Sequence, residues 1–258
     1  MTPKSTGLDD FLSKYKDEDS CQKYFEGIRF RKGDYCPHCG FTTIYRFDDG
    51  KRYRCASCKK DFTIKTGTVF GESKIPLRKW FIAIYLLTTC RKGISSVQLA
   101  KQVGVTQKTA WFMDHRIRKA MKQGRVQLFG TVEADETYVG GKEKNKHRSK
   151  RVTGAYGRSL DTKTPVFGIL QRGGEIRVNV IPDARMRTIE SKIVEHERGY
   201  IGIYHWMSRK HLQRYVDEFA YRFNTRDVDF TEVFSQMVSN VTKSTVLPYK
   251  ALIADAKP

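Results

Sequence analysis

The spacing of hydrophobic residues changes along the chain, from the three-to-four spacing of helices in the first half to strand-like alternation in the second. Residues 8 to 30 show the helical spacing, which predicts one or two short packing helices. Pro76 begins a longer helix that ends near Cys90. Its broad apolar face is typical of a core helix and contains Leu77, Trp80, Phe81, Ile84, Leu86 and Leu87.

The segment from Ser95 to Met121 predicts two helices around a tight turn. Ser95 caps the first helix, Gly104 allows a left-handed turn and Thr106 caps the second helix. This is the order of a helix-turn-helix, although many helical hairpins share the pattern, so DNA binding and simple packing both stay open. The second helix is predicted to expose to solvent a set of side chains that could contact the major groove of DNA: Gln107, Lys108, Arg116, Arg118 and Lys119.

Strand-like patterns follow Gly130. Residues 131–139 alternate, residues 165–171 form a continuous apolar run and residues 175–181 alternate again, which predicts a three-stranded antiparallel meander. A helix is expected from Met186 to His196. The last clear helix runs from Arg209 to Asn224, with one apolar and one charged face.

Composition makes a polyanion the expected partner. With 258 residues and 39% hydrophobic content, the chain can hold a sizeable core and one or two small modules. Lysine and arginine total 48 against 28 acidic residues, a net charge of +20, which favours nucleic acid. A membrane surface is the competing partner, but the basic residues are spread along the whole chain and interleaved with aromatics, without one long amphipathic basic helix. The loop between the first two strands is either a solvated loop or a phosphate-tracking loop, through Lys144, Lys146 and Arg148.

Four cysteines form two C-x-x-C pairs separated by fifteen residues, and they predict a zinc ribbon over residues 33–70. The zinc ligands are Cys36, Cys39, Cys55 and Cys58. Two disulfides are the alternative, but the chain has no secretory signal, so a reducing compartment is expected. His38 lies inside the first pair and is interpreted as a surface histidine, because four thiolates already complete the shell.

The order of these parts resembles an insertion-sequence transposase of the bacterial group that carries an N-terminal zinc ribbon before a DDE-type, ribonuclease-H-like catalytic domain. The most specific segments are the strand Val-Glu-Ala-Asp-Glu-Thr-Tyr-Val-Gly-Gly at 132–141 and the helix at 211–224, which ends in Arg-Phe-Asn. The expected fold class is therefore α+β and multi-domain, with an incomplete ribonuclease-H-like α/β domain. Its expected parts are a helical segment (1–32), the zinc ribbon (33–70), the helix-turn-helix region (71–126) and the transposase domain (127–258).

The resemblance implies metal-dependent DNA cleavage and strand transfer, in which acidic side chains hold two magnesium ions. Asp135 matches the first catalytic aspartate of the family and is the expected magnesium ligand. Glu190, in Ile189-Glu190, echoes the isoleucine-glutamate that precedes the family's third catalytic position, and it is the candidate to stand in for the missing acid. No counterpart of the second aspartate is found, because the chain passes directly from the helix ending near His196 into residues 198–206. An internal deletion is therefore expected.

Further expectations follow from the same resemblance. Zinc would be structural and magnesium catalytic, and the partner would be double-stranded DNA at the terminal inverted repeats of the element. The protein would be a homo-oligomer in the bacterial cytoplasm, associated with the nucleoid and not with a membrane. The alternative is a non-catalytic zinc-ribbon and helix-turn-helix DNA-binding protein derived from a transposase. A zinc-ribbon transcription regulator unrelated to transposition would leave the strand-rich half unexplained.

Overall fold

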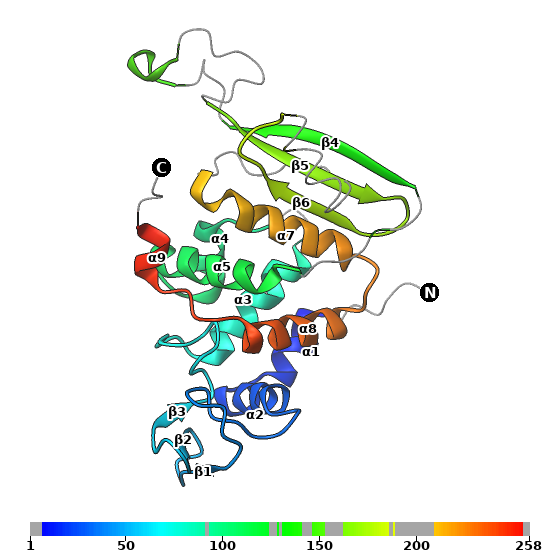
Figure 1. Cartoon of the computed structure of the whole chain (residues 1–258). Helices are drawn as coiled ribbons and strands as arrows, with labels where there is room; N and C mark the ends of the chain where they lie inside the picture. Colours follow the sequence, from blue (N-terminus) through cyan, green and yellow to red (C-terminus); the bar gives the residue numbers. More distant parts are fainter. Residues whose placement is uncertain are drawn as a thin grey trace. The chain divides into compact units, whose positions relative to one another are not determined.

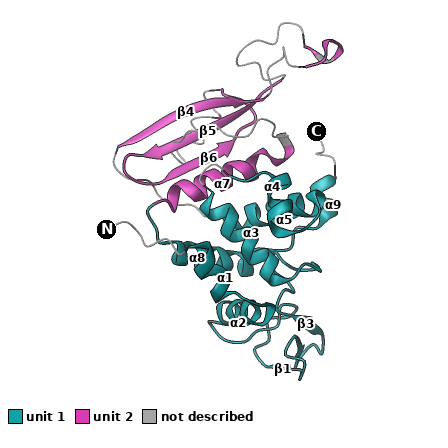
Figure 2. Cartoon of the chain, turned by 180° about the vertical axis from the view of Figure 1, so that it is seen from behind, with its two compact units in different colours: residues 1–121, 227–258 teal, residues 122–226 magenta. Residues whose placement is uncertain are grey.

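The structure is a computed structural model, and it describes the residues 7–90, 93–123, 128, 131–140, 146–152, 162–185, 188 and 209–254. The chain divides into two compact units (Figure 2). Unit 1 consists of residues 1–121 and 227–258, and unit 2 of residues 122–226. The sequence predicts a single domain over 127–258, whereas residues 227–258 belong to unit 1. This boundary prediction missed the packing of the C-terminal helices.

Unit 1 is mainly helical, with the small zinc-ribbon sheet inserted between its second and third helices (Figure 1). Its helices are α1 (Leu8–Lys14), α2 (Glu18–Arg29), α3 (Leu77–Thr89), α4 (Ser96–Val103), α5 (Gln107–Met121), α8 (Phe230–Lys243) and α9 (Tyr249–Ile253). The predicted N-terminal and core helices are thereby confirmed. Helix α8 packs against α2, α3 and α5, so the C-terminal part of the chain completes the core of the N-terminal part.

Helix α8 was not predicted, although its sequence carries a helical signal. Asp229 caps it by accepting a hydrogen bond from the amide of Thr231 at 2.8 Å. Its buried apolar residues follow the spacing of one helix face: Val233, Phe234, Met237, Val238 and Val241. The ring of Phe234 lies 5.1 Å from that of Phe11, and the ring of Phe81 lies 5.3 Å from Phe234.

Helices α4 and α5 form the predicted helical hairpin. The Ser95 hydroxyl accepts a hydrogen bond from the amide of Gln98 at 3.2 Å, which caps α4. Gly104 ends α4 in the left-handed conformation with a φ of 68°. The Thr106 hydroxyl accepts from the amide of Thr109 at 3.2 Å, as expected of a cap for α5. The local signals of the turn are therefore confirmed.

The ribbon sheet is a three-stranded antiparallel sheet of β1 (Ile44–Arg46), β2 (Arg52–Cys55) and β3 (Asp61–Thr63), in that order. Tyr53 and Phe62 face each other in the register of β2 and β3, and their rings stack at 5.3 Å. The buried Arg29 of α2 donates to the carbonyl oxygens of Ile64 and Thr66, the latter at 2.7 Å. This arginine fixes the ribbon to the helical part of unit 1.

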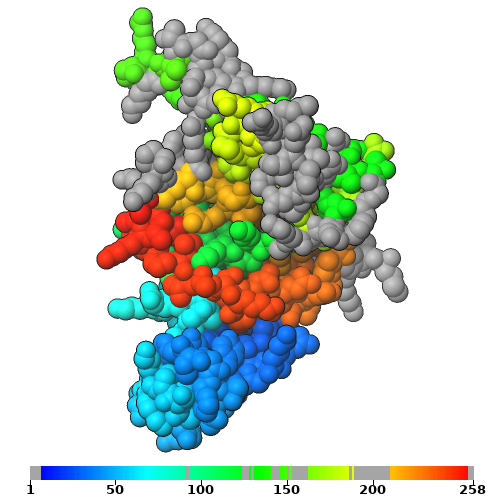
Figure 3. Space-filling view, in the orientation of Figure 1, coloured from blue at the N-terminus to red at the C-terminus, as the bar shows by residue number. Residues whose placement is uncertain are grey.

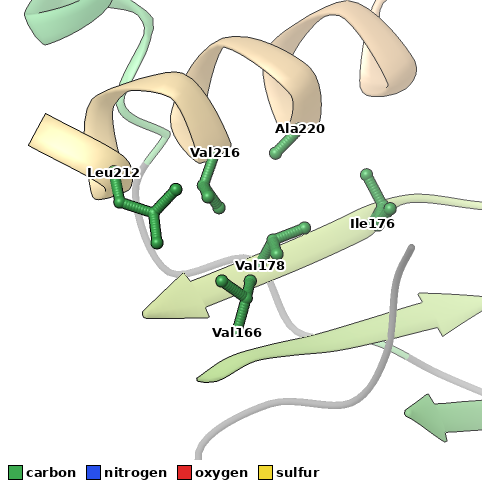
Figure 4. Close-up of a cluster of buried hydrophobic side chains, with 6 residues drawn as sticks. All are labelled: Val166, Ile176, Val178, Leu212, Val216 and Ala220. Atoms are coloured by element: carbon green, nitrogen blue, oxygen red, sulfur yellow. The ribbon is translucent and has the colours of Figure 1, made fainter. Parts of the chain in front are cut away.

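Unit 2 contains the predicted meander. Its strands β4 (Val132–Val139), β5 (Thr164–Gln171) and β6 (Ile176–Val180) pair antiparallel in the order β4-β5-β6. Two 3-10 turns (Arg148–Lys150 and Arg209–His211) and helix α7 (Leu212–Asn224) complete the described elements. Figure 4 shows the core between α7 and the sheet, formed by Val166, Ile176, Val178, Leu212, Val216 and Ala220. The helix predicted from Met186 to His196 lies outside the described residues, apart from Thr188.

Two carboxamide side chains of α7 satisfy backbone groups of β6 that β5 does not use. Asn224 accepts from the amide of Ile176 at 2.7 Å and donates to the carbonyl of the same residue at 2.9 Å. Gln213, three helical turns earlier, accepts from the amide of Val180 at 2.8 Å. An edge strand otherwise offers such groups to another chain. The Asn224 of the Arg-Phe-Asn segment therefore has a structural role in this sheet.

Candidate functional site

The four predicted zinc ligands come together in the ribbon. The sulfur atoms of Cys36, Cys39, Cys55 and Cys58 all lie within 4.8 Å of one another. Two Sγ–Sγ distances are 3.7 Å, between Cys36 and Cys58, and 3.6 Å, between Cys39 and Cys55. A tetrahedral site with zinc–sulfur bonds of about 2.3 Å separates its sulfurs by about 3.8 Å. A disulfide needs about 2.05 Å, so the arrangement fits zinc and not the alternative of two disulfides.

Each cysteine pair lies in a tight loop of the same geometry. The amide of Gly40 donates to the carbonyl of Cys36 at 2.9 Å, and the amide of Lys59 donates to the carbonyl of Cys55 at 3.2 Å. Both residues adopt the left-handed conformation, with φ values of 77° and 58°. Glycine takes this conformation without steric cost and lysine does not, so the second loop is the more strained. Each loop brings its two sulfurs together from within five residues of sequence.

Backbone amides also point at the sulfur atoms. His38 donates to Cys36 Sγ at 3.4 Å and Ser57 donates to Cys55 Sγ at 3.3 Å. Burial raises the pKa of the Cys55 thiol, but amide donors from Cys58 and Ser57 outweigh it and lower that pKa to about 7. These amide donors thus favour the metal-binding thiolate form of Cys55. The imidazole of His38 is exposed and does not join the cluster, as the sequence predicted.

The second candidate site, around Asp135, is incomplete among the described residues. Asp135 lies in the middle of β4, is exposed, and faces Gly168 of β5 in the register. One carboxylate oxygen accepts from the amide of Glu136 at 2.9 Å. Glu133, on the same face of the strand, forms an ion pair with Arg172.

Within the described part of the chain, the cysteine cluster is the only group of three or more histidine, cysteine or acidic side chains with ligand atoms close enough to hold a metal. A complete magnesium site is therefore not assembled there, and Asp135 is the single candidate ligand. Asp183 instead binds its own turn: it accepts from the Thr188 hydroxyl at 2.7 Å and the Arg185 amide at 3.0 Å. Those two bonds, in that order, lower the pKa of its carboxyl.

Some of the predicted site residues cannot be placed. Glu190 and Lys144 lie outside the described residues. In the basic loop, Arg148 is exposed, and the carbonyl of Lys146 accepts from Arg151 Nε at 3.0 Å.

The prediction that Arg116 and Arg118 of α5 face solvent is wrong, because both side chains are 2% exposed. Arg116 donates to the carbonyl oxygens of Leu247 at 3.1 Å and Gly71 at 2.8 Å. Burial lowers the pKa of its guanidinium to about 10. Arg118 lies 4.0 Å from the carboxylate of Asp114, which is also buried. These arginines hold the core of unit 1 together and cannot contact DNA in this arrangement.

The C-terminal segment after α8 covers this face of α5. Lys119 Nζ donates to the carbonyl of Thr245 at 2.9 Å, and Lys108 Nζ lies 5.0 Å from the centre of the Tyr249 ring. In Figure 3 this segment is red and lies on the surface of unit 1. Gln107 and Lys108, in the first turn of α5, remain exposed. Only this first turn keeps the surface position that the helix-turn-helix prediction requires.

Among the described residues, no helix combines the length and the apolar character needed to cross a bilayer.

Comparison with known families gives two matches in one chain. The family model described as the transposase zinc-ribbon domain matches residues 16–61. The model described as the ISXO2-like transposase domain matches residues 127–196 and 183–224, two segments that overlap at 183–196. The chain is similar to an uncharacterized protein in the transposable element ISH50 of Halobacterium salinarum, with 34% identity over 187 residues. The match covers 69% of this chain and 63% of that relative, and no solved structure matches the chain.

Proposed function

Because the chain belongs to the ISXO2-like transposases that carry a transposase zinc-ribbon domain, we propose that it binds the ends of an insertion element and takes part in DNA cleavage and strand transfer. The observation that carries the proposal is the presence of both family domains in one chain. The zinc-ribbon match, residues 16–61, includes all four cysteines of the sulfur cluster.

Double-stranded DNA is the proposed partner, and the net charge of +20 supports it. In unit 1 the proposed contacts are the exposed side chains of Gln107 and Lys108, since the first residues of a recognition helix are those that reach base edges. In unit 2 they are Lys146 and Arg148 of the basic loop. Transposition joins two element ends, so two or more copies of the chain would act together.

Asp135 is the proposed metal ligand of the catalytic domain. Magnesium, when bound by such a site, would supply activation of the attacking oxygen and neutralisation of the phosphate charge. This chain contributes an exposed carboxylate in the middle of a strand, opposite Gly168 in the register. Among the described residues, Asp135 belongs to no group of three or more side chains whose ligand atoms could hold a metal together.

That last observation favours a second candidate function. A chain that keeps the ribbon and the α4–α5 hairpin but lacks a second metal ligand would bind element ends without cutting them. Such a protein would compete with an intact transposase for the same DNA.

Nicking of element-end DNA in the presence of magnesium separates the two functions. The transposase proposal expects nicking by the wild type, its loss in Asp135→Asn and its retention in Glu133→Gln. Glu133 is the matched control because it lies on the same face of the same strand and is paired with Arg172. Nicking that persists in Asp135→Asn would remove Asp135 as a ligand.

Salt-dependent binding with no cleavage by the wild type would establish the second function instead. A chain that neither binds nor cuts element-end DNA would contradict both.

A further inference from the structure

The exposed cations of residues 31–60 fall into two groups, and the first group is neutralised by carboxylates. Arg46 Nη1 lies 2.9 Å from Asp34, Arg52 Nε 2.6 Å from Asp49 and Arg54 Nε 2.6 Å from Asp61. These pairs raise the pKa of each arginine through hydrogen bonds to its carboxylate. Such arginines carry little uncompensated charge toward a partner.

The second group carries its charge without a carboxylate. Its five side chains are all exposed, and none enters an ion pair or a hydrogen bond within the described part of the chain: Arg31, Lys32, Lys51, Lys59 and Lys60. Lys59 and Lys60 directly follow the second cysteine pair. Surface cations that have no internal partner are the groups that release counterions when a phosphate backbone binds.

Two aromatic rings of the ribbon are also left outside the core. Phe41 is 46% exposed and Tyr45 is 59% exposed, whereas Tyr53 and Phe62 are 2% and 3% exposed. The exposed rings are four residues apart, so their Cα atoms are at most about 14 Å from each other. Folding of the ribbon gains little from these rings, because the stacked pair of Tyr53 and Phe62 already fills its interior.

Backbone pairing brings the exposed rings and the unpaired lysines to one region of the ribbon. The carbonyl of Thr43, between the two rings, accepts from the amide of Ala56 in the second cysteine loop at 3.1 Å. The carbonyl of Lys60 accepts from the amide of Cys55 in the same loop at 3.1 Å. We define the aromatic edge as Phe41 and Tyr45 together with Lys59 and Lys60, which directly follow the second cysteine pair.

We propose that the aromatic edge binds unstacked bases of DNA, with the two lysines on the neighbouring phosphates. In an intact duplex the faces of the bases are covered by stacking, so exposed rings gain most from DNA whose strands are separated. Aromatic rings stack on any base and are therefore tolerant of sequence. The inference rests on the proposed function, because cleavage and strand transfer generate DNA ends and junctions with unpaired strands.

The test measures binding of the full-length, zinc-loaded chain to two fluorescent probes, an element-end duplex and a forked DNA of the same sequence with single-stranded arms. We expect Phe41→Ala with Tyr45→Ala to weaken binding to the forked probe roughly tenfold or more, with duplex binding and the salt dependence unchanged. We expect Lys59→Gln with Lys60→Gln to reduce the slope of log affinity against log salt on the forked probe by about 1.4.

The matched control is Arg54→Gln, which removes a cation of the same module that already has a carboxylate partner. It should leave the salt slope unchanged. A zinc content of one per chain in each variant shows that the ribbon is folded.

Equal weakening on both probes would replace the proposal with duplex contacts, as in a minor-groove wedge. If Phe41→Ala with Tyr45→Ala binds the forked probe as tightly as the wild type does, the proposal is overturned. In that case, binding of the duplex by the wild type would still leave the proposed function standing. Absence of wild-type binding to either probe would contradict the proposed function and the inference together.

Discussion

The two candidate metal sites differ in how far apart their ligands lie in the sequence. In the ribbon, four sulfurs come from two short loops, and the residues Cys36 and Cys58 at its limits are only 22 positions apart. In β4, Asp135 has a defined position, but the described residues do not complete a metal site around it. Its other ligands would have to come from distant parts of the chain. A site built from local loops is complete as soon as those loops form. A site built across a sheet depends on every strand and helix that carries a ligand.

The largest expected effect is the loss of the cysteine cluster. Cys58→Ser should prevent zinc binding and unfold residues 33–70, because a structural zinc site contributes on the order of 10 kcal/mol to folding. Amide hydrogen exchange with and without a chelator measures the effect, and unit 2 should keep its protection. The control Cys90→Ser removes a half-buried thiol outside the cluster and should bind one zinc. Full protection of the ribbon after chelation would show that zinc does not hold it.

A smaller effect is expected from the loss of a buried ion pair in unit 2. Glu218 is fully buried, and its Oε1 lies 3.0 Å from Nη2 of Arg222. Glu218→Gln should destabilise unit 2 by about 3 to 5 kcal/mol, since it leaves a buried arginine without its counter-charge. Urea unfolding measures the loss.

The exposed pair of Asp49 and Arg52 provides the control for that experiment. Asp49→Asn should leave the unfolding midpoint unchanged, because solvent screens the pair. If Glu218→Gln has no more effect than Asp49→Asn, the buried pair does not stabilise unit 2.

A third effect is a pH dependence that originates in unit 2. Burial raises the pKa of Asp217 from 3.8 to about 6, against the opposing hydrogen bond from Gln213. The folded chain then holds this proton more tightly than the unfolded chain. The stability that protonated Asp217 contributes is therefore complete below about pH 4 and is lost as the pH rises through 6, by on the order of 3 kcal/mol. The difference in unfolding free energy between wild type and Asp217→Asn should fall across this window, and a constant difference would contradict the assignment.

The smallest effect on stability is expected at Asp135 itself. Its side chain is exposed, so Asp135→Asn should change the free energy of unfolding by less than about 0.5 kcal/mol. Thermal denaturation provides the measurement. Together with Cys58→Ser it contrasts the two regions: removal of a cluster ligand unfolds the ribbon, whereas removal of the strand carboxylate does not. A large loss of stability in Asp135→Asn would mean that this aspartate has a structural role.

The features that the sequence predicted correctly are those decided within a few residues. The two cysteine loops, the caps at Ser95 and Thr106 and the left-handed Gly104 depend on neighbours in the chain, and each is found as expected. The meander was also predictable, because strand alternation and short connections favour pairing between successive strands.

The errors arose where distant residues decide the outcome. Arg116 was expected at the surface because its own helix offers no reason to bury it. It is buried because Leu247, 131 positions later, supplies a backbone carbonyl. The prediction ended the regular structure at Asn224 and so missed α8, although the apolar spacing of residues 233–241 was present in the sequence. The residues that would complete a metal site with Asp135 are likewise decided by parts of the chain that lie far from it in the sequence.

Zinc K-edge X-ray absorption of the purified full-length chain tests the central claim most directly. Four sulfur neighbours at about 2.3 Å, and no nitrogen or oxygen neighbour, are predicted for one zinc per chain. A nitrogen neighbour at about 2.0 Å would place His38 or another imidazole in the shell. That result, or a chain that holds no zinc, would contradict a metal centre completed by the two cysteine loops alone.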